Sequence, residues 1–284
     1  MPTGALAAYL TLAPGVIWVA LFLIVPLGFV TLISFYTPVG AAGFKPVLTI
    51  GNYVTIFTNP TNIGILLLTL RLSLTVTAIC IVLAYPVAYF LATKIKNEAH
   101  QTLLLIFMLI PFWIDWTVRM LAWYPILGRM GIINALFVQI GALKEPSDLF
   151  IFNELSATFV MIQSYVLFMI APIFLSMIKI DRSMLEAADT LGADKLRAFY
   201  HVTFKMSLPG IVIGSVFVFV MTMADFATPR LLGGFIQTIG LSIAYQMGVL
   251  NWPLAAAFST IFLALTVAIV YLMFRVVDIK RMIF

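Results

Sequence analysis

Charged residues and cysteine are both scarce in this sequence. Lysine, arginine, aspartate and glutamate make up 10% of the 284 residues, whereas a soluble domain carries about a quarter. The single cysteine, Cys80, lies inside an apolar run and implies neither a disulfide nor a metal site. No stretch is long enough and polar enough to form a separate soluble domain. The sequence therefore predicts one all-α, polytopic membrane domain that covers residues 1–284.

Motifs of catalytic chemistry are missing as well. The sequence contains no G-x-x-x-x-G-K-[ST] loop, no H-E-x-x-H, no C-x-x-C, and no set of nucleophile, histidine and acid. We therefore expect no catalytic residue, bound metal or cofactor in this chain, which cannot hydrolyse ATP by itself. The net charge of +5 comes from basic residues beside apolar runs. That pattern is typical of membrane topology and does not indicate nucleic-acid binding.

Long apolar runs dominate the sequence. Apolar residues make up 63% of the chain, and a helix needs about 20 residues to cross a bilayer. The runs predict six membrane-spanning helices, at residues 9–34, 63–93, 102–123, 155–178, 208–228 and 252–277. The first run lacks a basic leader segment and a cleavage site, so we expect it to be retained as a span. Pro111 interrupts the third run, and residues 124–153 are expected to include short interfacial helices.

The distribution of lysine and arginine predicts the orientation of these spans. With both termini on one side, that side carries ten basic residues: Lys94, Lys96, Lys179, Arg182, Lys195, Arg197, Lys205, Arg275, Lys280 and Arg281. The opposite side carries four: Lys45, Arg129, Lys144 and Arg230. The excess places both termini in the cytoplasm. Arg71 falls inside the second span, where it either extends to the outer interface or pairs with a carboxylate on another helix.

The most polar segment in the second half of the chain covers residues 183–206. Ser183 and Glu186 have the spacing of a capping box, which predicts a helix that starts directly after Ser183. Gly192 is expected to end this helix, because glycine enters the left-handed conformation at little steric cost. Asp194 is expected to cap a second helix. The residues predicted on the buried side of that second helix are Leu196, Phe199 and Tyr200.

Glu186-Ala187-Ala188, followed by three residues and Gly192, resembles the EAA loop of permease subunits of ATP-binding-cassette (ABC) importers. In that family the loop is the coupling helix, which sits in a cleft of the cytoplasmic ATPase. The resemblance implies a coupling loop at about residues 179–207. The residues that it assigns to ATPase contact are Leu185, Glu186, Ala187, Ala188 and Gly192. The family pattern continues with I-x-L-P, where this sequence has Val202-Thr203-Phe204-Lys205 and lacks the proline.

The resemblance also implies a fold, a location and a set of partners. It implies the type I importer permease fold in the bacterial cytoplasmic (inner) membrane. The expected partners are an ABC ATPase dimer that binds ATP and Mg²⁺, a second permease subunit of different sequence, an extracytoplasmic solute-binding protein, and membrane lipid. No nucleic acid is expected among them.

Two acidic residues, Asp115 and Asp225, lie near the predicted outer ends of spans, where a carboxylate facing lipid would be very costly. Arg119 follows the first and Arg230 follows the second within five residues, so each acid is interpreted in one of two ways. Either it pairs with its arginine, or it faces the translocation pathway and attracts a cationic solute. Aromatic faces also attract cations, and the neighbouring aromatic residues are Trp113, Trp116 and Phe226.

The tract from Asp225 to Gly234 and the turn from Pro111 to Trp113 resemble the spermidine/putrescine-type permeases within the ABC family. The resemblance extends over roughly residues 15–277. It implies a small cationic organic solute such as a polyamine, although related permeases carry other small organic solutes. Two alternatives remain at this point: an ion-coupled secondary transporter or channel, and a membrane-embedded enzyme. The first should place ionisable groups near mid-span and show internal repeats, and the second should show a catalytic cluster.

Overall fold

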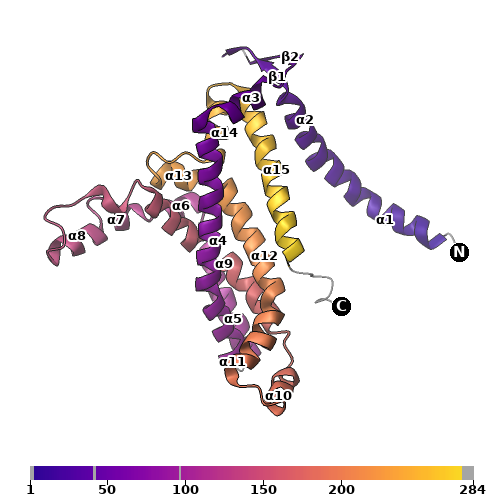
Figure 1. Cartoon of the computed structure of the whole chain (residues 1–284), viewed down its shortest axis with the longest axis vertical. Helices are drawn as coiled ribbons and strands as arrows, with labels where there is room; N and C mark the ends of the chain where they lie inside the picture. The colour runs from indigo at the N-terminus through magenta and orange to yellow at the C-terminus, as the bar shows by residue number, and fades with distance from the viewer. Residues whose placement is uncertain (1–2, 41–42, 96, 277–284) are drawn as a thin grey trace. The chain divides into compact units, whose positions relative to one another are not determined.

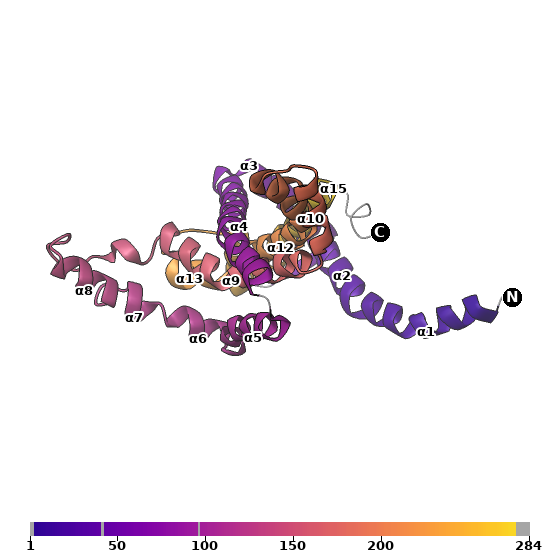
Figure 2. The ribbon, with the colours of Figure 1, turned by 90° about the horizontal axis from the view of Figure 1, so that it is seen from below.

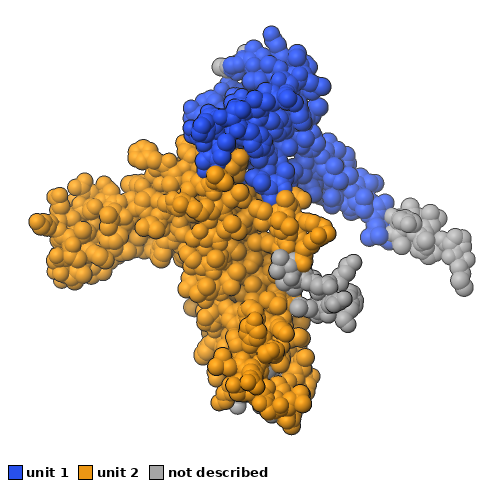
Figure 3. Space-filling view, viewed as in Figure 1, with its two compact units in different colours: residues 1–64, 242–265 blue, residues 65–241, 266–284 orange. Residues whose placement is uncertain are grey.

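The computed structural model describes residues 3–40, 43–95 and 97–276. Helices account for 79% of the structure. Six segments within the described residues are long and apolar enough to cross a membrane, as predicted. The chain divides into two compact units, residues 1–64 with 242–265 and residues 65–241 with 266–284 (Figure 3). Lys96, Lys280 and Arg281, which entered the count of basic residues, and Val277, the predicted end of the last span, lie outside the described residues.

Unit 1 begins with the first predicted span. Helix α1 (Thr3–Val19), the π turn η1 (Ala20–Ile24) and α2 (Val25–Ile33) follow one another without a break (Figure 1). The polar loop after this span contains an antiparallel pair of short strands, β1 (Tyr36–Pro38) and β2 (Phe44–Leu48), in which Thr37 pairs with Lys45. Helix α3 (Gly51–Thr58) comes next, and the buried Asn52 amide donates to the carbonyls of Ser34 and Tyr36. These bonds fix α3 against the end of α2.

Unit 2 is built around three helices, α4 (Pro60–Lys94, of which residues 65–94 belong here), α9 (Glu154–Met177) and α12 (Lys205–Ala224) (Figure 1). On α4 the residues facing the core recur every four positions, which is one face of a helix. They include Leu72, Val76, Cys80, Ala84 and Ala88. Helices α9 and α12 pack directly against each other, and each provides further residues to the same core.

Two glycines allow α12 to approach α9 closely. A Cβ at Gly210 would lie 2.8 Å from Ile173 Cα, and a Cβ at Gly214 would lie 3.1 Å from Met169 Cα. Real Cβ atoms are essentially never as close as the first of these distances. The G-x-x-x-G spacing on the fifth span therefore marks a helix contact, as such spacing does elsewhere in membranes.

The third predicted span, residues 102–123, is wrong as a single helix. Helix α5 (Glu98–Leu109) passes into a 3-10 turn, η3 (Ile110–Trp113), and the backbone is extended at Ile114. Helix α6 (Trp116–Leu121) then starts anew, because the Asp115 carboxylate accepts hydrogen bonds from the amides of Thr117 and Val118. Figure 2 shows α5 to α8 following one another in a row. The third segment of membrane length is Trp116–Gln139, and Ala99–Trp113 is a shorter apolar helix.

Residues 124–153 contain short helices, as predicted. They are α7 (Tyr124–Leu127), α8 (Ile132–Gln139) and the 3-10 turn η4 (Asp148–Phe150). The buried Asn134 donates to the carbonyl of Gly128 and accepts from the amide of Ser147, so one side chain holds both ends of the loop around α8.

The remaining elements lie on either side of α12 in the sequence. Before it come α10 (Arg182–Thr190), α11 (Lys195–Ala198) and the π turn η5 (Phe199–Phe204), and after it come α13 (Ala227–Leu232), α14 (Ile239–Gly248) and α15 (Trp252–Val276). The fifth span was predicted at residues 208–228, but its helix ends at Ala224 because Asp225 starts the next helix.

Candidate functional site

Helix α10 carries the residues that resemble the EAA loop, and Asp181 determines where it begins. The Asp181 carboxylate accepts a hydrogen bond from the Ser183 amide at 3.0 Å, and its carbonyl accepts from Met184 at 3.1 Å. The hydrogen bond from Ser183 holds the pKa of Asp181 below its usual range. The capping box predicted between Ser183 and Glu186 is therefore wrong, because a charged acceptor two residues earlier already occupies the helix N-terminus.

Gly192 ends this part of the loop, as predicted. Its φ is +75°, which is the left-handed region that favours glycine. The amide of Ala193 donates to the carbonyl of Ala188 at 3.0 Å and closes the turn. No described atom lies within 4 Å of the position that a Cβ on Gly192 would take. A larger residue here would meet backbone strain rather than a collision.

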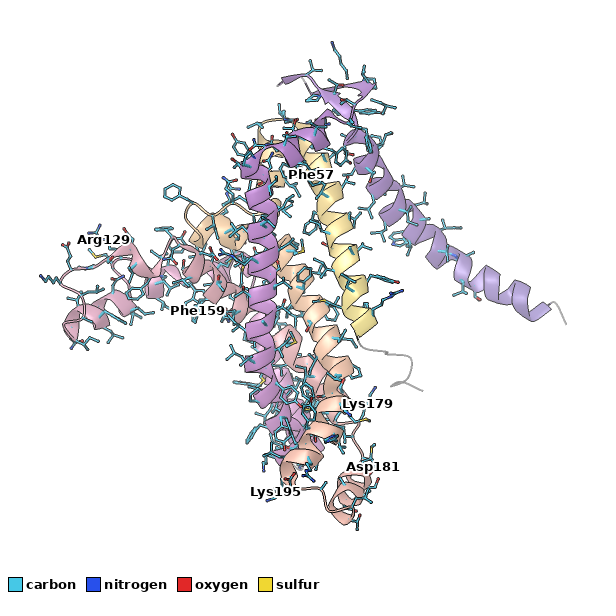
Figure 4. All side chains as sticks on the ribbon, in the orientation of Figure 1. Phe57, Arg129, Phe159, Lys179, Asp181 and Lys195 are labelled. Atoms are coloured by element: carbon cyan, nitrogen blue, oxygen red, sulfur yellow. The ribbon has the colours of Figure 1, made fainter. Side chains whose placement is uncertain are left out.

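The loop exposes apolar side chains in a polar surrounding. Leu191 is 88% exposed, Leu196 is 78% exposed, and Met184 is also exposed. Glu186 and Ala187 are exposed and Ala188 is partly buried, while the side chain of Leu185 lies outside the described ones. Figure 4 shows Lys179, Asp181 and Lys195 around α10 at one end of unit 2. Exposed apolar groups rimmed by charge are typical of protein interaction surfaces.

The second helix of the loop differs from the prediction. Asp194 does cap α11, since its carboxylate accepts from the Arg197 amide at 2.7 Å. However, Leu196 and Tyr200 are exposed, and only Phe199 of the three predicted residues is partly buried. Phe199 and Tyr200 lie in the π turn η5, whose residues per turn differ from those of an α-helix, so they do not share the face of Leu196. The chain then continues into α12 through Lys205, at the position where the family pattern has proline.

Asp225 lies at the other end of α12 and is only 5% exposed. One carboxylate oxygen accepts from the amides of Ala227 and Thr228 at 3.1 and 2.9 Å. The other accepts from the hydroxyls of Thr228 at 2.5 Å and Tyr165 at 3.0 Å. The carboxylate thus caps α13 and joins it to α9. Arg230 is exposed, so the ion pair that its spacing suggested is not what holds Asp225.

The other predicted residues lie at different depths. The Trp116 ring meets Tyr165 edge-on at 5.3 Å between centroids, so it joins the Asp225 group through that tyrosine. Asp115 is exposed and caps α6, while Trp113 and Phe226 are also exposed. Arg119 lies over the Phe112 ring at 4.9 Å. The structure brings Trp116 and Asp225 together and leaves the other three outside this group.

Sequence reasoning missed Tyr165 and Thr228. Thr228 had a detectable signal, because a threonine three residues after an aspartate suits an N-terminal cap with a second hydroxyl contact. Tyr165 had none, since it lies 60 residues away in an apolar helix. Its hydroxyl becomes a partner of Asp225 only when α9 and α12 pack together.

Among the described side chains, one ion pair is closer than 4.0 Å, between Arg71 on α4 and Glu154 at the start of α9. One nitrogen of Arg71 lies 2.6 Å from both oxygens of Glu154. Of the two interpretations of Arg71, pairing with a carboxylate on another helix is therefore confirmed. In the described part of the chain, no group of three histidine, cysteine, aspartate or glutamate residues could hold a metal ion.

Comparison with known proteins identifies the family. No family model matches the chain. The chain is 30% identical over 259 residues to the spermidine/putrescine transport system permease protein PotB of Haemophilus influenzae, which covers 89% of both chains. It is 32% identical over 244 residues to PotB of Escherichia coli, covering 85% of this chain and 87% of the relative. It is also 30% identical to the E. coli inner membrane ABC transporter permease protein YdcU, over 76% of this chain and 72% of that one.

Solved structures show the same fold at low sequence identity. A chain of a bacterial ABC transporter that imports the acidic polysaccharide alginate aligns with a TM-score of 0.70 at 17% identity, covering 97% of this chain and 96% of that one. A chain of the alginate transporter in complex with an alginate-pentasaccharide-bound periplasmic protein aligns at 0.67 and 16% identity. The identity and coverage of the PotB proteins place this chain in their family. It belongs to the spermidine/putrescine-type permeases and is a transmembrane permease subunit of an ABC importer, not an enzyme.

Proposed function

We propose that this subunit forms part of the translocation pathway for a polyamine and uses α10 to couple transport to a separate ATPase. The observation that carries the coupling role is the surface of α10 and α11, where Leu191 and Leu196 are almost fully exposed on a charged loop. The substrate class is supported by the names of the PotB relatives, which are spermidine/putrescine permeases. The secondary transporter and the enzyme considered from the sequence are set aside by the family.

The partners follow from how such a subunit must work. Because this chain has no phosphate-binding loop, ATP and Mg²⁺ would be bound by a partner ATPase dimer. A second permease subunit of different sequence would complete the pathway, and lipid would cover the remaining apolar surface. A solute-binding protein outside the membrane is supported by the related alginate importer, which was solved with its periplasmic protein. The name of the YdcU relative supports the inner membrane as the location.

The coupling role assigns a task to each residue of the loop. Asp181 and Gly192 determine the two ends of α10, so they define it as a short separate helix. Glu186, Ala187 and Ala188 would lie in the ATPase cleft, because the small alanines allow close approach and the glutamate is exposed for pairing. Leu185 is included by its position in α10. When the ATPases close on ATP, movement of the cleft would displace α10 and the chain that follows it.

For the solute, we propose that Trp113, Asp115, Trp116 and Phe226 face the cation and that Asp225 lies behind them. Asp115, Trp113 and Phe226 are exposed, and aromatic faces beside a carboxylate replace part of the water that an ammonium group loses. Asp225 reaches this group through Tyr165 and Trp116. Its negative charge would act over a longer range, while its hydrogen bonds position α13.

The substrate proposal is tested by reconstitution of the complete complex. We expect spermidine or putrescine, delivered by the solute-binding protein, to raise the rate of ATP hydrolysis several-fold in proteoliposomes. The reason is that a partner which binds one conformation of the complex better than the other shifts the population toward that conformation. A neutral sugar of similar size provides the control. If the sugar stimulates hydrolysis and neither polyamine does, the substrate class is wrong, although the coupling role of α10 would stand.

The orientation is tested by labelling in intact cells. In a Cys80→Ala background, single cysteines at the exposed positions Asn97 and Ser183 should resist an impermeant thiol reagent added outside. Cysteines at Lys45 and Lys144, which are also exposed, should react. The reason is the excess of basic residues on the side of Asn97 and Ser183, which the positive-inside rule keeps in the cytoplasm. Permeabilised cells give the control in which all four positions react, and a reversed pattern in intact cells would overturn the orientation.

A further inference from the structure

Helix α4 and the π turn η5 are in contact where the regular hydrogen bonding of an α-helix is interrupted in each, by Pro86 in α4 and by the π geometry in η5. Phe199 opens η5, and its ring meets Tyr89 and Tyr85 of α4 edge-on, at 5.6 and 6.0 Å between centroids. These two tyrosines lie on either side of Pro86, within one helical turn. All of these residues belong to unit 2. The first turn after the coupling loop therefore contacts the side chains that flank the proline of α4.

Two further contacts tie the same segments together. Phe204, the last residue of η5, lies 5.9 Å from Tyr85 between ring centroids. The hydroxyl of Tyr85 is 3.2 Å from that of Ser207, which is fully buried on α12. We refer to the five side chains of Tyr85, Tyr89, Phe199, Phe204 and Ser207 as the aromatic joint. Through it, α4 is held to both ends of η5.

Both helices bend most easily at this level. Pro86 has no amide hydrogen, so the carbonyl four residues before it lacks its usual intrahelical donor, and the ring disfavours a straight helix. The π turn closes wider hydrogen-bonded rings than an α-helix and marks local strain in a helix. Kinks in helices occur at such positions. Pro209, two residues after Ser207, adds a further such position at the start of α12. A force that reaches either segment is therefore expected to bend the helices near this level rather than along the regular turns.

The joint lies on the route by which α10 continues into the span that follows it, α12. Gly192 is followed by α11, α11 passes without a break into η5, and η5 passes without a break into α12. A displacement of α10 reaches Phe199 before it reaches any residue of α12. The far end of α12 is attached to α9 through Asp225 and Tyr165. Helix α9 precedes α10 by four residues and packs against α12. Without the contact at η5, a movement of the loop would therefore act on α9 and α12 and not directly on α4.

We propose that the aromatic joint transmits displacement of α10 to α4, so that α4 and α12 bend together at Pro86 and η5. The proposal rests on the coupling role given to α10 above. In it Phe199 is a positioning residue: it touches neither solute nor ATPase and acts through Tyr85 and Tyr89. The π turn leaves α12 continuous with the loop through Lys205 while still providing a flexible point.

The first test measures movement directly and does not depend on the solute. In the assembled complex, spin labels at Thr93→Cys on α4, beyond Pro86, and at Lys195→Cys on α11, before η5, both exposed positions, report the distance between the moving ends of the two helices in a Cys80→Ala background. With the joint intact, addition of ATP and vanadate should leave this distance unchanged, because the helices move together. With Phe199→Ala, the same addition should shift the distance or add a second population. An unchanged distance in both proteins would overturn the proposal.

The second test measures coupling, as spermidine transported per ATP hydrolysed in proteoliposomes. The two edge-on aromatic contacts of Phe199 together change an equilibrium constant by about tenfold. Phe199→Ala should therefore lower the amount of spermidine transported per ATP by up to about tenfold. Phe199→Leu, which keeps apolar volume, should restore part of it. Phe159→Ala provides the matched control, because Phe159 makes an edge-on contact of similar geometry with Trp123 away from the joint. A fall of equal size in Phe159→Ala would mean that the effect is general loss of packing.

A third variant covers the case in which Phe199→Ala does not assemble. Pro86→Ala restores an amide donor and favours a straight helix, so it should lower the coupling ratio without lowering stability. A normal ratio in Pro86→Ala would overturn the proposal by itself. Gly192→Asp distinguishes a failure of the aromatic joint from a failure of the coupling role of α10. If it uncouples transport while Phe199→Ala and Pro86→Ala behave as wild type, the joint is wrong and the coupling role of α10 stands. If Gly192→Asp also has no effect, the coupling role has failed.

Discussion

Replacing Gly192 by aspartate is expected to lower coupled transport strongly while the protein stays in the membrane. Gly192 has a φ of +75°, and a side chain in the left-handed region costs roughly 1–2 kcal/mol. The chain can avoid this cost by shifting the turn, which would displace α10 in its cleft. Because 1.4 kcal/mol corresponds to about a tenfold change, we expect uptake to fall at least about tenfold. The measurement is polyamine uptake and solute-stimulated ATP hydrolysis in the reconstituted complex, with membrane abundance measured by immunoblotting.

The chain contains a matched control for backbone strain. Gly141 also has a φ of +75°, and no described atom lies within 4 Å of the position of its Cβ. Gly141→Asp therefore introduces the same strain after α8, away from the coupling loop, and should leave coupling near the wild-type level. Glu186→Lys provides a second test of the cleft, since it reverses a charge on the exposed face without strain. If Gly192→Asp and Glu186→Lys both transport normally, α10 is not the coupling element.

Asp225→Asn is expected to lower uptake of a cationic solute by about tenfold or more while the protein keeps its abundance. The asparagine oxygen can still accept from the amides of Ala227 and Thr228, so α13 keeps its cap. The new amide group faces the hydroxyls of Tyr165 and Thr228, which can turn to accept. What is lost is the negative charge. At the longer range proposed for Asp225, about 8 Å, a charge pair contributes roughly 2 kcal/mol at an effective dielectric of about 20 before desolvation, which is more than one decade.

Two further variants separate charge from structure at Asp225. Asp225→Ala removes the acceptors of four hydrogen bonds, and each buried donor left unsatisfied costs roughly 1–3 kcal/mol. We therefore expect abundance to fall in this variant and not in Asp225→Asn. Neutralising Arg230 as well should not rescue Asp225→Asn, because Arg230 is exposed. Normal uptake by Asp225→Asn would mean that the carboxylate acts only as a cap, and solute selection would then rest with the solute-binding protein. Asp115→Asn, at an exposed cap, tests the outer part of the proposed pathway in the same assay.

Local features of the sequence were sufficient for much of the coupling loop. Gly192 as the end of the first helix and Asp194 as the cap of the second depend on bonds between residues at most a few positions apart. The start of α10 was missed because two acceptors compete there. Ser183 and Asp181 both stand where a side chain can cap the start of α10. The charged Asp181 takes this position because the N-terminus of a helix is its positive end. The positions of Phe199 and Tyr200 were missed because spacing rules assume an α-helix and the chain forms a π turn there.

The sequence by itself determined that the chain is a membrane protein and which loop resembles a coupling helix, and it predicts which side of the membrane carries most basic residues. These properties depend on composition and on short-range spacing, because a bilayer selects any run of about 20 apolar residues. The tertiary structure decided which polar groups of the membrane-spanning part bond to one another. Asp225 is bonded to Tyr165 across 60 positions, Arg71 to Glu154 across 83, and Tyr85 to Ser207 across 122. In an apolar surrounding an unpaired polar group is costly, and only the packing of α4, α9 and α12 determines which partner lies within reach.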